Sequence, residues 1–228
     1  DDDDLAILDG LGKALDAVGQ AEQARRIGFV FQHPDDQIVT DKVFHELAFG
    51  PESLGWDQAR MRLAVAEMAS YFGLDELFEK NVAELSGGQK QLINLASAAV
   101  LRPDVLILDE PTAGLDPAGC QRILETICDY REKTGSTVVI VSHSMDDVAR
   151  IADRLIVFNH GSIRFDGTLE EVFSNPKELS DIGLSVPAPT QIASALREQG
   201  VEIEGSVYTT EQLLAALLKL KKEVGRNA

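Results

Sequence analysis

The sequence has little positive charge for its length. Its 228 residues include 21 lysines and arginines against 38 aspartates and glutamates, a net charge of −17 with the histidines neutral. A general nucleic-acid binder needs a basic face for the phosphate backbone, and adhesion to anionic lipid also needs basic clusters. The charge balance therefore argues against both classes, and we expect no nucleic-acid partner.

Cysteine and long apolar runs are also scarce. Cys120 and Cys128 are the 2 cysteines of the chain, too few for the disulfide scaffold of a small secreted domain and without the spacing of a metal site. They fit best as small apolar residues on a helix in a reducing compartment. No apolar run reaches the roughly 20 residues that span a bilayer as a helix.

Strand and helix patterns alternate along the middle of the chain. Apolar strands are predicted at 27–31, 105–108 and 137–141, with helices after Ser86 and at 117–133. Continuously apolar strands joined by helices are typical of a parallel sheet covered on both faces. The predicted fold class is therefore α/β, in which ligands bind at the carboxyl edge of the sheet.

The flanking regions have other patterns. Helical periodicity from about residue 42 to 78 is broken at Gly50-Pro51 and at Gly73. A hairpin is predicted to turn at Asn159-His160-Gly161. After Thr168 the sequence predicts an appended region of short helices, at 170–173, 190–199 and 211–222.

Two adjacent carboxylates, Asp109 and Glu110, follow the strand at 105–108. Such a pair suits a Mg²⁺–phosphate site, in which Asp109 holds the ion through water and Glu110 polarises the attacking water. Taken alone, a solvated acidic turn explains the pair about as well.

The stretch Ser86-Gly87-Gly88-Gln89 opens a predicted helix. Glycines at a helix N-terminus expose backbone N–H groups to an anion, and the helix dipole adds to the attraction. A glycine turn with a serine cap is the simpler explanation of this stretch by itself. Gln32 and His143, each at the end of a predicted strand, are equally weak signals in isolation.

In their order along the chain, these residues resemble the motifs of the ATP-binding-cassette (ABC) ATPases. The similar stretches are Gln32 for the Q-loop, 85–89 for the signature sequence, 105–110 for Walker B, 113–116 for the D-loop and His143 for the switch histidine. The resemblance spans residues 27–168. It implies a P-loop NTPase-type (RecA-like) parallel sheet with an α-helical subdomain and a C-terminal helical extension.

Residues 28–39, 46–52 and 182–187 resemble a narrower group, the energy-coupling factor (ECF) transporter ATPases of the cobalt-type branch. This implies an ATP-binding and ATP-hydrolysing subunit of an ECF-type importer, which couples hydrolysis to uptake of a vitamin or a transition-metal ion. One alternative is the ATPase of another ABC importer, which residues 34–38 and the tail disfavour. The other is a non-catalytic, signature-bearing interaction module.

The resemblance also implies roles for single residues and two cofactors, ATP and Mg²⁺. Glu110 acts as the general base, and His143 fixes the γ-phosphate and the attacking water. Gln32 senses the nucleotide and contacts Mg²⁺, which Asp109 holds through water. Phosphoryl transfer depends mainly on such positioning and charge stabilisation.

The implied partners follow from a head-to-tail dimer of ATPase subunits, homomeric or heteromeric, which sandwiches each ATP. A γ-phosphate held by the second subunit is contacted by Ser86, Gly87, Gly88 and Gln89, while Asp116 links the two sites. A transmembrane coupling subunit docks in the groove beside 32–38, and a substrate-binding membrane subunit acts indirectly. The expected location is peripheral, on the cytoplasmic face of the cell membrane.

The resemblance divides the chain into a series of segments. Residues 1–31 are predicted to be a remnant of the N-terminal nucleotide-binding subdomain with an acidic insertion. The Q-loop and the helical signature subdomain occupy 32–100, and the RecA-like core with Walker B, D-loop and H-loop occupies 101–168. Residues 169–228 form the C-terminal helical extension, which is predicted to aid dimerisation.

One motif of the family is missing from these 228 residues, the P-loop G-x-x-x-x-G-K-[ST] that binds the β- and γ-phosphates. The nearest match is Gly12-Lys13, which Ala14 follows, and Ile7 stands in the place of the first glycine. We expect a fragment of a longer gene product that is inactive alone. A natural degenerate subunit is the alternative, but it predicts loss of Glu110 and His143, and both are present.

Overall fold

The computed structural model describes residues 19–224. The chain divides into two compact units, Asp1–Val141 and Ser142–Ala228, and each is described by itself. The boundary between them lies inside the predicted segment 101–168, and the predicted segments remain predictions.

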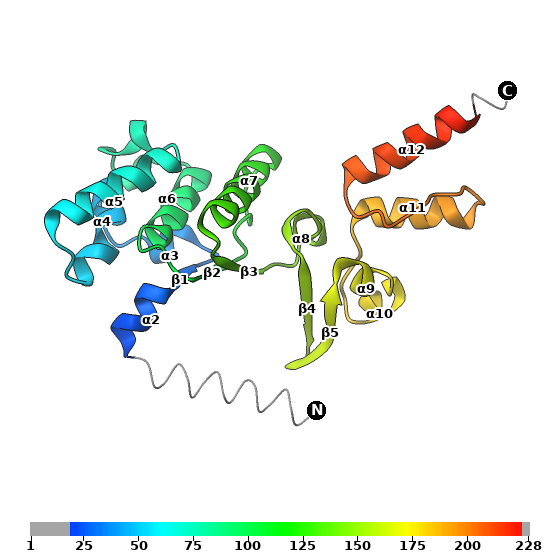
Figure 1. Ribbon diagram of the computed structural model, residues 1–228, viewed down its shortest axis with the longest axis horizontal. Coiled ribbons are helices and arrows are strands. Elements are labelled where there is room, and N and C mark those ends of the chain that lie inside the picture. Colours follow the sequence, from blue (N-terminus) through cyan, green and yellow to red (C-terminus); the bar gives the residue numbers. More distant parts are fainter. Residues whose placement is uncertain (1–18, 225–228) are drawn as a thin grey trace. The chain divides into compact units, whose positions relative to one another are not determined.

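A parallel sheet of 3 strands, in the order β1-β2-β3, organises the first unit (Figure 1). The strands are β1 (Ile27–Val30), β2 (Val105–Asp109) and β3 (Thr137–Val141). Residue pairs such as Val30↔Leu108 and Leu108↔Ile140 set the register. These strands confirm the predicted ones to within a residue at each end.

Helices connect and cover these strands. The short α2 (Gln20–Arg26) leads into β1, and α3 (Pro34–Gln37), α4 (Val43–Ser53), α5 (Gln58–Tyr71) and the 3₁₀ turns η1 (Asp75–Leu77) and η2 (Val82–Glu84) follow it. Next come α6 (Gly87–Ala99) before β2 and α7 (Pro117–Thr134) before β3. Side-chain caps begin three of these helices, at Asp57, Ser86 and Asp116.

The core of the first unit lies on one face of the sheet. Alternate strand residues, among them Val30, Leu106 and Leu108, are fully buried with apolar residues of α6 and α7. The opposite face, in the described part of the chain, exposes Phe29 and Val141 by 43% and 53%. The apolar strands predicted cover on both faces, and the described residues of this unit provide it on one face.

The predicted helix break at Gly50-Pro51 is wrong, because α4 continues through Pro51 to Ser53. Pro51 is buried, and the Leu54 N–H donates to the Gly50 carbonyl (3.1 Å), so the last turn closes around the proline. Packing outweighs the local penalty for an interior proline here. The break at Gly73 is confirmed, since φ there is 65° and α5 ends at Tyr71.

An antiparallel hairpin and a series of helices make the second unit (Figure 1). The hairpin joins β4 (Arg154–Asn159) to β5 (Ser162–Thr168), and positive φ at His160 and Gly161 forms the predicted turn. The helices are α8 (Met145–Ile151), α9 (Leu169–Phe173), α10 (Pro176–Asp181), α11 (Ala188–Glu198) and α12 (Thr210–Val224). None of the helices in residues 19–224 combines the length and apolar character that crossing a membrane requires.

The leucines of α12 at 213, 214, 217 and 218 are spaced as one helix face, and only one of them is buried. Leu213 is buried in a small cluster with Ala193, Ile203 and Val207. Leu214, Leu217 and Leu218 are exposed. Only part of that face therefore packs on the second unit itself.

Candidate nucleotide site

The carboxyl edge of the parallel sheet brings Gln32, Asp109 and Glu110 together. Since β1 and β2 are adjacent and parallel, with Val30 opposite Leu108, the residues that follow both strands leave the sheet at the same edge. This is the arrangement that the sequence predicted for the Mg²⁺–phosphate residues.

The backbone at Glu110 has an unusual conformation. Its φ is 45°, in the left-handed region that costs a non-glycine residue about 1–2 kcal/mol. Hydrogen bonds fix it on both sides, since its N–H donates to the Val141 carbonyl (2.9 Å) and its carbonyl accepts from the Ala113 N–H (3.0 Å). Such over-determined strain is typical of functional sites.

The side chain of Gln37 clamps the segment that contains Gln32. Gln37 Nε2 donates to the Phe29 carbonyl (3.0 Å), and Gln37 Oε1 accepts from the Phe31 N–H (2.8 Å). The side-chain amide thus pairs with the end of β1 as a neighbouring strand would. The turn that carries Gln32 is held at both ends, by β1 and by α3.

A buried carboxylate fixes the chain just beyond α3. Glu46 is only 5% exposed, and its Oε2 accepts from the N–H groups of Val39 (3.1 Å) and Thr40 (2.9 Å) and from the Thr40 hydroxyl (2.8 Å). These bonds compensate the burial of a charged group. Neither Gln37 nor Glu46 was predicted to have a role of its own, since each is an ordinary polar residue inside a stretch that resembles the ECF ATPases.

The predicted signature residues form the start of α6. Ser86 Oγ accepts from the Gln89 N–H (3.4 Å) and Gln89 Oε1 accepts from the Ser86 N–H (3.0 Å), which is a capping box. The Ser86 hydroxyl proton and the Gln89 amide nitrogen keep donor capacity for an anion. A Cβ on Gly87 meets no atom within 4 Å, so the space before the helix is open.

Two contacts join α6 to α3. Asn94, which is fully buried, donates from Nδ2 to the Pro34 carbonyl (3.1 Å). Lys90 Nζ lies 2.6 Å from Asp35 Oδ1. The segment after Gln32 and the helix that begins at Ser86 are therefore held together by direct bonds.

The predicted D-loop residue Asp116 caps α7. Its Oδ1 accepts from the Gly119 N–H (2.9 Å), and a Cβ on Gly119 would lie 2.7 Å from that oxygen. The preceding turn uses Gly114 at φ 72°. A Cβ on Gly88 would lie 3.7 Å from Leu115, so the D-loop and the start of α6 are neighbours.

His143 belongs to the second unit, in the segment that leads into α8. Ser142 Oγ accepts there from the Ser144 N–H (3.1 Å), and Ser144 caps α8 by accepting from the Asp147 N–H (3.4 Å). The structure brings His143 together with these serines, and it brings the other site residues together in the first unit.

The donor set at the sheet edge fits Mg²⁺ bound together with phosphate. The groups are carboxylate and amide oxygens of Asp109, Glu110 and Gln32, which hard cations prefer. The described residues contain no cluster of three or more His, Cys, Asp or Glu that could hold a metal. Mg²⁺ usually takes one or two protein ligands and completes its shell with water and phosphate oxygens.

Comparisons with known proteins agree with a nucleotide site. The family model described as ABC transporter matches residues 7–113. This match begins before residue 27, where the resemblance predicted from the sequence begins. Its first residues, 7–18, lie outside the described range.

The energy-coupling factor transporter ATP-binding protein EcfA2 of Clostridioides difficile (strain 630) is 44% identical over 207 residues, which is 90% of this chain and 72% of that protein. EcfA1 of Clostridium perfringens (strain 13 / Type A) is 39% identical over 94% of this chain and 75% of its own length. A solved structure of cbiO1 from Clostridium perfringens, part of the ABC transporter complex cbiONQ, is 31% identical. It superposes with a TM-score of 0.65 over 77% of this chain and 69% of that one.

Proposed function

The chain belongs to the energy-coupling factor transporter ATP-binding proteins, within the ABC transporter ATPases, and we propose that it couples ATP hydrolysis to uptake of a vitamin or a transition-metal ion. The proposal rests on two features of the first unit. Gln32, Asp109 and Glu110 follow adjacent strands at one sheet edge, and the space at the start of α6 is open. The parallel sheet and helical cover are those of an ABC ATPase.

The sheet-edge residues act on a nucleotide whose phosphates are held by a P-loop. Asp109 orients the water molecules around Mg²⁺, which neutralises phosphate charge when bound. Glu110 accepts a proton from the attacking water, and its fixed left-handed backbone sets the direction of its side chain. Gln32 would hold Mg²⁺ together with Asp109, and His143 would orient the γ-phosphate.

The start of α6 acts on a second nucleotide, held by a partner ATPase subunit. Ser86 and Gln89 donate to the γ-phosphate, and Gly87 and Gly88 allow the backbone to approach it closely. Asp116, which caps α7 beside this surface, links the two nucleotide sites of the dimer.

The partners in this proposal are a second ATPase subunit, a transmembrane coupling subunit at the groove beside 32–38, and indirectly a substrate-binding membrane subunit. Relatives named as ECF transporter ATP-binding proteins and a structural neighbour from a cbiONQ complex support this assembly. The protein then lies peripherally on the cytoplasmic face of the membrane. ATP binding moves the Gln32 segment, and closure of the dimer drives the membrane subunits.

Glu110→Gln tests the catalytic part, in a protein that carries a P-loop segment ahead of this chain. Loss of the carboxylate base abolishes ATP turnover while Mg-ATP stays bound. Glu76→Gln, an exposed residue in η1, is the matched control and retains turnover. Retained hydrolysis in Glu110→Gln removes Glu110 from its proposed role.

A further inference from the structure

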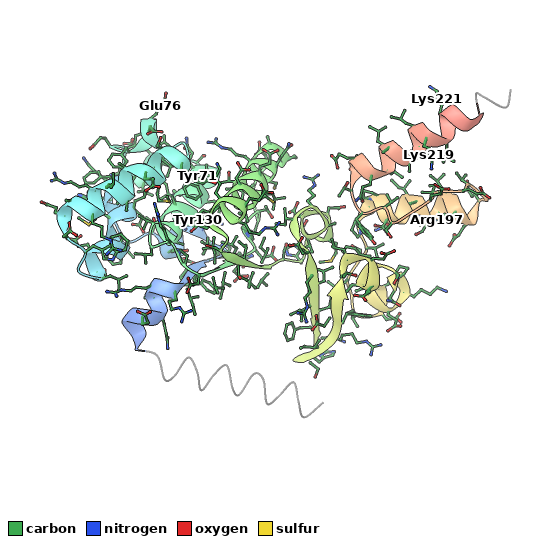
Figure 2. All side chains as sticks on the ribbon, in the orientation of Figure 1. Tyr71, Glu76, Tyr130, Arg197, Lys219 and Lys221 are labelled. Carbon is green, nitrogen blue, oxygen red and sulfur yellow. The ribbon has the colours of Figure 1, made fainter. Side chains whose placement is uncertain are left out.

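A cavity of about 390 Å³ opens in the first unit at the edge of the sheet opposite to the nucleotide residues. It is lined by residues of α5 and α7 and by Arg102 and Ser136, which precede β2 and β3. Tyr71 and Tyr130, labelled in Figure 2, form an aromatic wall with ring centroids 6.4 Å apart at an interplanar angle of 70°. Neither tyrosine has a part in the proposed ATPase chemistry.

Both tyrosine hydroxyls are buried without a hydrogen-bond partner in the protein. Tyr130 is only 1% exposed. The nearby Ser136 Oγ donates to the Pro103 carbonyl (2.8 Å) and lies 3.0 Å from Thr134 Oγ1. Native structures leave few buried polar groups in this state, and each one calls for an explanation.

The Tyr130 hydroxyl is held in its donor form. Burial raises the pKa of Tyr130 above the ordinary 10.0, and the Ser136 hydroxyl and the Arg102 charge offset only part of that rise. A neutral phenol offers a proton to an acceptor. A hydrogen-bond acceptor in the cavity would satisfy this hydroxyl.

The lining carries more positive than negative charge. Arg102 Nη2 lies 2.7 Å from both carboxylate oxygens of Glu67, which balances that pair. Lys133 Nζ lies 4.6 Å from the centre of the Tyr71 ring, as a second cation. A cationic cavity is unusual on a chain with a net charge of −17, and it selects for an anion.

We propose that this cavity binds a small organic anion with a flat apolar body, of the aromatic carboxylate class. The tyrosine rings and Met68 contact the body, and Lys133 pairs with the carboxylate. The carboxylate oxygens accept from the two phenolic hydroxyls. The volume lies within the range of small-molecule pockets, and the proposal does not depend on the proposed ATPase function.

Titration of the full chain with benzoate, followed by backbone amide NMR, tests this. Benzoate shifts the amides around Tyr71, Tyr130 and Lys133. Benzyl alcohol lacks the charge and acetate lacks the ring, so each binds about tenfold more weakly or worse. Absence of saturable binding by benzoate, or equal binding of acetate, overturns the proposal.

Three variants locate the site. Lys133→Gln weakens benzoate about tenfold, and Tyr130→Phe weakens it about three- to tenfold because one hydrogen bond is lost. Lys80→Gln, an exposed lysine of the same unit, leaves the affinity unchanged. Tyr130→Phe also keeps or raises the Tm of the free protein, since its hydroxyl has no partner to lose. A lowered Tm overturns the premise that this hydroxyl is unsatisfied.

Discussion

The amide of Asn94 donates to the carbonyl of Pro34 at 3.1 Å, and this bond joins two segments that lie 60 residues apart in sequence. One end belongs to α6, which Ser86 caps, and the other lies two residues after Gln32. Under the proposed roles of these segments, we predict that movement at Gln32 reaches α6 through this part-buried bond.

Asn94→Ala lowers the free energy of unfolding by about 1–2 kcal/mol. The variant leaves the half-buried Pro34 carbonyl without its donor, but it also removes the Asn94 Oδ1 atom, which accepts no bond. Urea denaturation measures the change. Asp35→Asn is the comparison, and because Asp35 is 76% exposed, loss of its pair with Lys90 costs less than about 1 kcal/mol. Equal losses of unfolding free energy in the two variants contradict a stabilising role for the bond between Asn94 and Pro34.

Gln37→Ala releases the backbone at the end of β1. The Phe31 N–H loses its acceptor and the Phe29 carbonyl loses its donor, so local opening becomes easier. Hydrogen exchange at the Phe31 amide accelerates, while the Leu108 amide in the central strand is unaffected. Gln58→Ala, at the exposed start of α5, is the control. Unchanged exchange at Phe31 shows that the clamp does not hold this turn.

The capping box at the start of α9, in the second unit, is sensitive to acid. The N–H and the hydroxyl of Thr168 hold the pKa of Glu171 below its ordinary 4.5. A carboxylate with a lowered pKa in the folded state contributes stability above the unfolded value, and this is lost as pH falls through the folded value. Denaturation between pH 6 and 3 therefore shows a shallower loss of stability in Glu171→Gln than in the parent. Parallel curves contradict this account of the cap.

Tyr130 makes the first unit sensitive to alkali. Because burial raises its folded-state pKa above 10.0, the folded chain keeps this proton longer than the unfolded chain does. The stability it contributes is complete below the unfolded pKa and declines as pH rises past that value. Denaturation series from pH 8 to about 11 show a smaller decline in Tyr130→Phe than in the parent. An identical decline in both proteins contradicts the shifted pKa.

The strands and the hairpin could be predicted because their signals are local. Val105–Asp109 and Thr137–Val141 are apolar runs that stop at polar residues, and His160-Gly161 carries its own turn preference. The pairing of Asp109 and Glu110 with the turn at Gln32 followed from the parallel sheet. These features needed only short-range pattern and one topological rule.

What was missed depends on contacts between distant residues. Gln37 and Asn94 are ordinary polar residues in sequence, and only the folded backbone gives them their carbonyl partners. The cavity between Tyr71 and Tyr130 forms where α5 and α7 meet, which no spacing encodes. The break expected at Pro51 failed for the same reason, since burial of the ring stabilises an interior proline.

Mg-ATP titration tests the central claim that this chain completes an ATP site held by another subunit. The chain alone is titrated first, followed by its mixture with a family member that carries the G-x-x-x-x-G-K-[ST] motif. We expect no measurable Mg-ATP affinity for the chain alone. In the mixture the partner binds ATP more tightly than by itself, and Gly88→Asp in this chain removes the gain by placing a carboxylate against the γ-phosphate. Micromolar binding by the chain alone, or a partner affinity that this chain leaves unchanged, contradicts the claim.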